Sequence, residues 1–322
     1  MKTTNRGGAL LAVLWLSAAL TAIAFSVAST VRSETERAST DSESLRTYYL
    51  ASGAVERALL WREWGRDRKT PNDPVAPLYF EFPSGDARVE MIPETSKLNV
   101  NTSSPDELAA LLAAIGAPPD TASAIAAGIV DWRTALPPEE TTAFDQYYLS
   151  LGSSFRARHA SFEEIEELLL IRGMTPELFY GGYWRGPAGQ LIAHAALRDC
   201  VSVYGSPNSG YDVNTVTPAV LSALGLAPEQ VHAVVEMRRA APIRSMDQLG
   251  LIGEAPGLSR LRVGGGAFWT VRATARLRLQ NGQYSDLRRT VAAMVRDNGP
   301  EEPRRFFVMR WYDNMPMEGA VR

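Results

Sequence analysis

The sequence predicts an α+β fold in which one long N-terminal helix packs on an antiparallel sheet, with short helices between the strands. Three observations lead to this prediction. An apolar run and a polar segment follow one another over residues 9–65 without a proline. Alternating, strand-like segments lie at 78–92 and at 268–312, and a repeated motif with helix-start signals lies between them.

The first half of the long helix has the composition of a membrane span. Residues 9–28 are largely apolar and uncharged, and they reach the roughly 20 residues that a bilayer requires. Arg6-Gly7-Gly8 stands directly before this run, and the positive charges of Lys2 and Arg6 favour a cytoplasmic N-terminus. A signal peptide is cut after its apolar run, so a cut at the glycine pair would leave the helix on the mature chain. An uncleaved signal anchor and a conventional cut near residues 27–28 are the alternatives.

The second half of the helix is amphipathic. Apolar or small residues recur every seven positions, joined by Tyr48 and Val55, with charged residues on the other faces. The recurring positions are Val31, Ala38, Leu45, Ser52 and Leu59. We expect this stripe to dock on a globular domain. A continuous helix over 9–65 would be about 85 Å long.

The strand-like segments predict a hairpin and a meander. Residues 78–82 and 87–92 flank the turn residues Pro83-Ser84-Gly85-Asp86. Residues 268–279 alternate between an apolar face and a face with three arginines, which we expect to be solvated. Asn281-Gly282 is a strong tight-turn signal, and 285–295 and 306–312 complete the meander. The apolar face is expected to pack on the long helix.

Two central segments resemble each other. Asn-Thr-x-(Ser/Thr)-Pro ends at Pro105 in the first and at Pro218 in the second, 113 residues apart. A hydroxyl cap followed by proline starts a helix, and a glycine near 116 or 225 ends it. Second helices are expected at 121–133 and 228–239, and further helices at 161–171 and 245–251.

Short helices of this kind resemble helix-hairpin-helix modules, which often bind the DNA backbone. DNA-binding hairpins offer a Gly-x-Gly turn to phosphate, but the turns here read Gly116-Ala117-Pro118 and Gly225-Leu226-Ala227. Residues 97–180 hold 12 acidic and 5 basic residues, which does not suit a phosphate track. A membrane-anchored DNA-uptake protein is therefore the alternative function rather than the preferred one.

The chain as a whole resembles pseudopilins, the pilin-like subunits of bacterial type II secretion, and among them the minor pseudopilin GspK family. The leader run Arg-Gly-x-Ala-Leu-Leu carries part of the resemblance. Stretches at 99–102, 129–133, 147–148, 167–179 and 201–205 carry the rest. The resemblance implies that prepilin peptidase cuts between Gly7 and Gly8, so that Ala12 is the fifth mature residue. Most pilin-like subunits have a glutamate there, which is thought to pair with a neighbour's N-terminal amine, and the GspK family lacks it.

The resemblance also implies a domain plan and a role. The plan is a leader (1–7), a transmembrane helix (8–28), an amphipathic helix (29–65), a pilin-like sheet domain (66–97 and 265–322), and an inserted all-α domain (98–264). That domain would hold two helix-hairpin-helix or SAM-like repeats, at 98–180 and 211–264. The implied role is to initiate or cap the tip of the periplasmic pseudopilus and so to drive export of folded proteins.

The location and partners follow from the same resemblance. The chain would cross the inner membrane once, with its N-terminus in the cytoplasm and its globular domain in the periplasm. Expected partners are other minor pseudopilins, the major pseudopilin, prepilin peptidase, the inner-membrane secretion platform and secreted substrates, but not nucleic acid.

A metal site is a further expectation from the resemblance, because relatives bind calcium in an aspartate-rich loop near residues 131–145. The candidate ligands are Asp131, Glu139, Glu140 and Asp145, since calcium takes about six to eight oxygens. Thr134 and Leu136 stand where further acids would be expected, so a solvated acidic loop is the alternative.

No catalytic motif is apparent, and we predict that the chain is not an enzyme. The three histidines, His159, His194 and His232, are scattered, and the sequence has no HExxH pair, nucleophile elbow or phosphate loop. Cys200 is the single cysteine and is expected in the core. The net charge of −3 shows no bias toward polyanions.

Overall fold

The computed structural model describes residues 6–64, 76–185, 189–193, 195–205, 210–299, 302 and 305–315. Several predicted features fall partly outside the described residues: positions 1–5 of the leader, residues 65–75 at the end of the long helix and the start of the sheet domain, His194, and residues 316–322.

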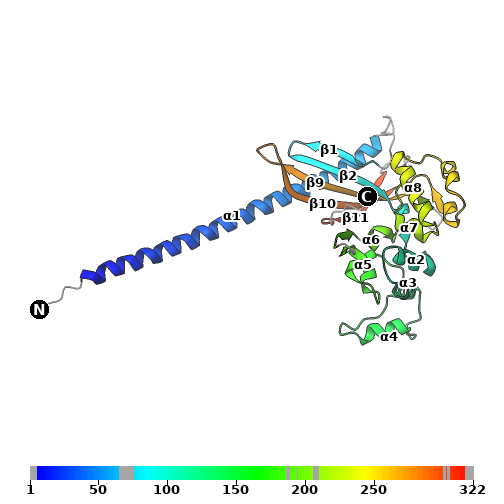
Figure 1. Ribbon diagram of the computed structural model, residues 1–322, viewed down its shortest axis with the longest axis horizontal. Coiled ribbons are helices and arrows are strands. Elements are labelled where there is room, and N and C mark those ends of the chain that lie inside the picture. The colour runs from blue at the N-terminus through cyan, green and yellow to red at the C-terminus, as the bar shows by residue number, and fades with distance from the viewer. Residues whose placement is uncertain are drawn as a thin grey trace.

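Helix α1 (Arg6–Trp64) is one continuous helix of 59 residues, about 88 Å long at a rise of ~1.5 Å per residue. Within the described part of the chain it is the one helix long and apolar enough to cross a membrane. None of its apolar window is buried. Figure 1 shows its N-terminal part projecting away from the rest of the molecule.

The C-terminal part of α1 packs on the sheet through a face that includes Val55 and Leu59 of the predicted stripe, with Tyr48 partly buried against it, and that also uses positions outside the stripe. The buried apolar positions are Leu50, Ala51, Ala54, Val55, Ala58 and Leu59. In the predicted seven-residue stripe, Leu59 is buried, whereas Val31, Ala38 and Leu45 are exposed. Alanines bring the helix axis close to the strands, and this close approach selects the buried face.

Five strands form one antiparallel sheet in the order β1-β2-β9-β10-β11. They are β1 (Leu78–Phe82), β2 (Gly85–Pro93), β9 (Phe268–Arg278), β10 (Tyr284–Asp297) and β11 (Phe306–Tyr312). The predicted hairpin and meander are confirmed. Strand β2 pairs with β9 from Gly85 opposite Leu277 to Pro93 opposite Trp269, so the helical region between them is an excursion from one sheet.

The two faces of this sheet differ. Val271, Ala273 and Ala275 lie on the face that packs on α1. The opposite face was expected to be solvated, but Arg272 is buried there, and its Nε and Nη2 donate to one oxygen of Glu90 at 3.0 and 2.7 Å. The guanidinium of Arg276 likewise donates to both oxygens of Asp86 at 2.8 Å. The β2–β9 pairing places each carboxylate directly opposite its arginine, which the pattern of β9 alone could not show.

The end of α1 is fixed to the sheet by Arg305. Its Nε and Nη2 donate to the two carboxylate oxygens of Asp297 at 3.0 and 2.9 Å. Its Nη1 donates to the carbonyl of Arg62, in the last turn of α1, at 3.4 Å. Burial raises the pKa of Asp297, but hydrogen bonds from Arg305 and from the Gly299 amide outweigh burial, and the net pKa lies below the ordinary value.

In the sequence, the helical region follows β2 and precedes β9. In space, it lies on the side of the sheet away from the projecting part of α1 (Figure 1). Its elements are η1 (Glu94–Ser96), β3 (Leu98–Asn99), α2 (Pro105–Ala114), α3 (Pro119–Arg133), α4 (Ala143–Ser150), η2 (Ile165–Leu170), α5 (Pro176–Tyr180), β4 (Tyr183–Arg185), β5 (Leu191–Ala193), α6 (Leu197–Cys200), β6 (Val201–Ser202), β7 (Tyr211–Asp212), α7 (Pro218–Ala223), α8 (Pro228–Ala240), η4 (Met246–Ile252), η5 (Pro256–Arg260) and β8 (Leu261–Arg262). The helices expected at 161–171 and 245–251 are 3₁₀ helices: η2 is shorter than expected, at 6 residues, and η4 has 7 residues.

The same hydrogen bonds occur at corresponding positions of the two similar segments. The side chain of Asn101 accepts from the amide of Phe162 at 2.7 Å and donates to its carbonyl at 3.0 Å. The side chain of Asn214 makes the same two bonds with Ile243, at 2.8 and 2.9 Å. Each asparagine therefore joins the start of its segment to a chain stretch just before a 3₁₀ helix.

An arginine repeats in the same way. Arg133 donates to the carbonyls of Val100 and Ser103, and Arg238 donates to the carbonyls of Val213 and Val216. Both guanidinium groups thus bind the backbone of their own segment. The two segments share one hydrophobic core, in which Leu111, Ile125, Leu221 and Val234 are among the buried residues.

Candidate functional site

The predicted processing site lies in the first turns of α1. Arg6 and Gly7 belong to the helix, and Gly8 and Ala12 are exposed. The first acidic residue of the chain is Glu34, so the apolar half of α1 holds no carboxylate that could pair with a neighbour's amine. Cleavage between Gly7 and Gly8 stays a prediction.

The predicted metal loop lies in the segment 131–160, which runs from the end of α3 through α4 to the stretch before η2. Asp131 is in α3, and Asp145 is in α4 rather than in the loop where we expected it. The residues between them include Glu139 and Glu140, which are exposed. The structure therefore brings two of the four candidate ligands together and leaves the other two at the surface.

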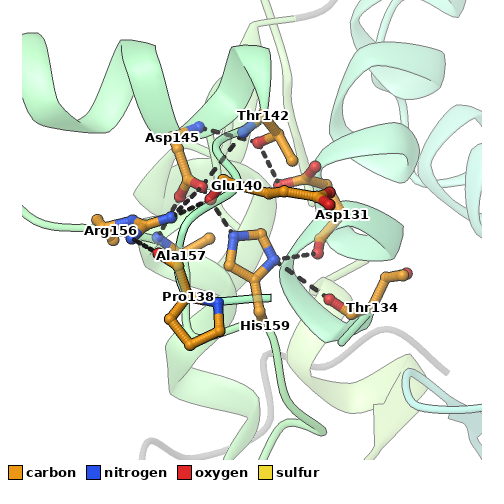
Figure 2. A network of polar contacts seen from close by, with 9 residues as sticks. All are labelled: Asp131, Thr134, Pro138, Glu140, Thr142, Asp145, Arg156, Ala157 and His159. Atoms are coloured by element: carbon orange, nitrogen blue, oxygen red, sulfur yellow. Dashed lines mark hydrogen bonds and ion pairs between the residues drawn. The ribbon is translucent and has the colours of Figure 1, made fainter. Parts of the chain in front are cut away.

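Asp145 is the centre of this segment. Its side chain is fully buried, and one carboxylate oxygen accepts from the amide of Ala157 at 3.0 Å. The other oxygen accepts from Nε2 of His159 at 2.9 Å, from Nη2 of Arg156 at 3.3 Å and from the amide of Thr142 at 3.3 Å. Figure 2 shows these donors converging on the carboxylate from three sides.

Both ring nitrogens of His159 lie against oxygen atoms of the described residues. Its Nε2 points to Asp145, and its Nδ1 lies 3.2 Å from the carbonyls of both Asp131 and Thr134 (Figure 2). A carbonyl cannot donate, so both ring nitrogens must donate, which is the pattern of the protonated imidazole. The backbone of His159 has φ of 49°, a left-handed conformation that few non-glycine residues adopt.

The electrostatics agree with this pattern. Burial lowers the pKa of His159, but the hydrogen bond and the charge of Asp145 outweigh burial, so the net pKa is raised. Burial raises the pKa of Asp145, and hydrogen bonds from His159, Ala157, Thr142 and Arg156 outweigh it, so the net pKa is lowered. Each group of the pair therefore favours the charged form of the other.

Arg156 closes the same segment from the other side. Its guanidinium donates to the carbonyls of Pro138 and Glu140 at 3.1 and 2.5 Å, in addition to Asp145. The hydroxyl of Thr142 donates to Asp131 at 3.2 Å and accepts from the amide of Asp145 at 3.1 Å. The carbonyls of Pro138 and Glu140 and the carboxylates of Asp131 and Asp145 are thus already bonded to N–H and O–H donors.

This arrangement does not fit a calcium ion. Calcium requires about six to eight oxygen ligands, and the oxygens nearest Asp145 are occupied by two cationic side chains. Among the described residues, no group of three or more His, Cys, Asp or Glu side chains is placed to hold a metal ion.

The sequence pattern missed His159 and Arg156. They lie 14 and 11 residues from Asp145, and no helical or strand period links them to it. The one signal available was a basic run, Arg156-Ala-Arg-His159, between Asp145 and the acidic stretch at 163–167.

Comparison with known proteins agrees with the fold. Residues 89–180 match a family model described as "Type II secretion system (T2SS), protein K". No curated protein sequence matches the chain. A chain in the crystal structure of the GspK-GspI-GspJ complex from the enterotoxigenic Escherichia coli type 2 secretion system has a similar fold, with a TM-score of 0.59 at 17% identity. The match covers 86% of this chain and 98% of that one.

The family model covers the segment 131–160 and the first of the two similar segments, and the fold is shared over nearly the whole of both chains. Over residues 89–180 the chain is thus similar to protein K of type II secretion systems, and over most of its length it shares its fold with a chain of the GspK-GspI-GspJ complex.

Proposed function

We propose that this chain is a minor pseudopilin that initiates or caps the tip of a periplasmic pseudopilus, together with other minor pseudopilins. The observation that carries the proposal is the large helical region, β3 to β8, set beside a single pilin-like sheet. A domain of this size beside each sheet would crowd the neighbouring subunits of a repeating shaft. One copy at an end meets no such obstacle.

The absence of an acidic residue before Glu34 supports the same position. A buried amine that lacks its partner charge is costly in an apolar environment. A subunit without a carboxylate at the fifth mature position would not compensate a neighbour's amine, so it suits the end of a filament. The proposal includes cleavage between Gly7 and Gly8 by prepilin peptidase, with the N-terminus in the cytoplasm and the globular part in the periplasm.

The outer face of α1 offers a contact surface for partners. Leu45, Tyr49, Leu60 and Trp64 are exposed along the part of the helix that covers the sheet. They lie opposite the buried alanines and leave an apolar stripe, which other helices of the same kind would cover. The related fold was solved with GspI and GspJ, and we propose that the corresponding two minor pseudopilins bind this chain.

The helical region is best interpreted as two helix-hairpin-helix-like modules used as scaffold. The paired bonds of Asn101 and Asn214 support two copies of one module. Arg133 and Arg238, the basic residues nearest the hairpins, bind carbonyls of their own segments. Their guanidinium groups are therefore already engaged within the protein, which does not favour DNA uptake.

Co-purification tests the proposal. The full-length chain should form a complex with the other minor pseudopilins of its secretion system, and mass spectrometry should find Gly8 as the mature N-terminus. Leu45→Arg and Leu60→Arg should weaken that complex without lowering the melting temperature of the chain alone, whereas Arg46→Ala, also exposed, should not. A mature chain that begins at Met1, or no complex with any minor pseudopilin, would count against the proposal.

A further inference from the structure

The segment 131–160 places two basic side chains against its own buried carboxylate. Around Asp145 the structure gathers the imidazole of His159 and the guanidinium of Arg156, each within hydrogen-bond distance of the same carboxylate oxygen. The carbonyls of Asp131 and Thr134 face the imidazole. Those of Pro138 and Glu140 face the guanidinium. Carboxylate and carbonyl oxygens gathered around one point are also what a calcium site supplies.

Charge balance gives the reason for this arrangement. A fully buried carboxylate is strongly destabilising unless a charge partner and hydrogen bonds compensate it. Asp145 is fully buried, whereas the side chain of His159 is 10% exposed. The imidazole is therefore the buried partner, and the more exposed guanidinium of Arg156 adds a second charge at the rim.

The backbone conformation of His159 also agrees with a fixed contact between its imidazole and Asp145. His159 adopts the left-handed conformation, which is unfavourable for a side chain with a Cβ and persists where the surroundings fix it. The next amide, of Ala160, donates to the carbonyl of Trp132 at 3.2 Å. The chain is thus tied to the end of α3 directly beside the imidazole.

We propose that His159 and Arg156 take the place of a bound metal ion, so that the segment 131–160 of this pseudopilin is closed by its own side chains and folds without calcium. Closure of this kind makes the helical region independent of the calcium concentration around it. The contact between the end of α3 and the start of α4 then depends on His159 and Arg156, which no acidic motif in the sequence indicates.

Thermal unfolding of the full-length chain in detergent tests the proposal. The melting temperature is measured with EGTA and with calcium chloride at about 10 mM, which exceeds the ~0.1–1 mM dissociation constants of extracellular calcium modules. We expect the two values to agree within about 1 °C. A calcium site occupied at that concentration would raise the value by roughly 3 °C or more, and that result would overturn the proposal.

Three variants separate closure by these cations from a general effect of charge. Arg156→Ala and His159→Asn remove one cation each, and asparagine tolerates the left-handed backbone. Arg158→Ala is the matched control, because Arg156 and Arg158 are both 38% exposed and Arg158 pairs with Glu163 and Glu167 instead. We expect both test variants to melt roughly 4 °C or more below the control. If all three melt alike, the side chains do not close the segment, and the proposal fails even if calcium has no effect.

Discussion

Replacement of Asn214 should unfold the helical region at a measurably lower temperature. Asn214 is 7% exposed and Ile243, its partner, is 2% exposed, so water cannot easily replace the two hydrogen bonds between them. Asn214→Ala would leave a buried amide and a buried carbonyl unpaired, at about 1–3 kcal/mol each. We expect a loss of about 3 kcal/mol in the free energy of unfolding. That corresponds to a fall of roughly 6–12 °C in melting temperature for a region of this size.

Differential scanning calorimetry of the full-length chain in detergent provides the assay. Asn214→Asp keeps the shape of the side chain but cannot donate to the Ile243 carbonyl, so it should also destabilise. Asn101→Ala should cost less, because Asn101 is only partly buried. Asn281→Ala, in an exposed turn, should change little. The reasoning is refuted if Asn214→Ala melts at the same temperature as Asn281→Ala. It is also refuted if Asn101→Ala lowers the melting temperature more than Asn214→Ala does.

Three further predictions follow from other contacts. Gly257→Ala should destabilise strongly, because its Cβ would lie 2.3 Å from the carbonyl oxygen of Leu224, whereas Gly250→Ala meets nothing within 4 Å and should be tolerated in the same melting assay. The junction of α1 with the sheet should be acid-labile: the pKa of Asp297 lies below its ordinary 3.8 in the folded state, so its contribution to stability is present above that value and is lost as pH falls through the lower folded-state pKa. Asp297→Asn should therefore flatten the dependence of melting temperature on pH below about 4. Cys200 is buried, with a pKa raised to about 11, so a thiol reagent should modify it only after denaturant unfolds the chain, and rapid labelling at neutral pH would contradict this.

Local signals in the sequence were enough to find most of the fold. The hydroxyl-and-proline starts at Ser104-Pro105 and Thr217-Pro218 do form helix caps, in which each hydroxyl accepts the amide three residues on. Alternation predicted β9 and β10 because a strand with one buried face repeats every two residues. These features need only neighbours in sequence, so a single sequence reveals them.

The features that sequence reasoning missed all depend on contacts between distant residues. The buried face of α1 was only partly predicted: Val55 and Leu59 lie in it, but the sheet also selects small alanines that a seven-residue count cannot detect. Arg272 was expected in solvent because its partner Glu90 lies 182 residues away. His159 had no period or motif to connect it with Asp145, although the acids near it were noticed. The contact of Arg272 can be predicted only once the pairing of β2 with β9 is known, and that of His159 only once the return of the chain past α4 is known.

The unbroken course of α1 couples the direction of the globular part to the membrane. Between the apolar run and Thr47, the first buried residue, the helix has no proline or glycine, and ion pairs such as Arg32–Glu36 at 2.9 Å brace it. Removing one residue from this spacer would turn the whole sheet about 100° around the helix axis and bring it only about 1.5 Å nearer the bilayer. Removing seven would shorten the reach by about 10 Å yet change the azimuth by only about 20°. The length of this helix therefore sets both the rotation of the sheet about the helix axis and its distance from the bilayer. An assembly that requires one orientation of the sheet should tolerate the seven-residue deletion better than the one-residue deletion.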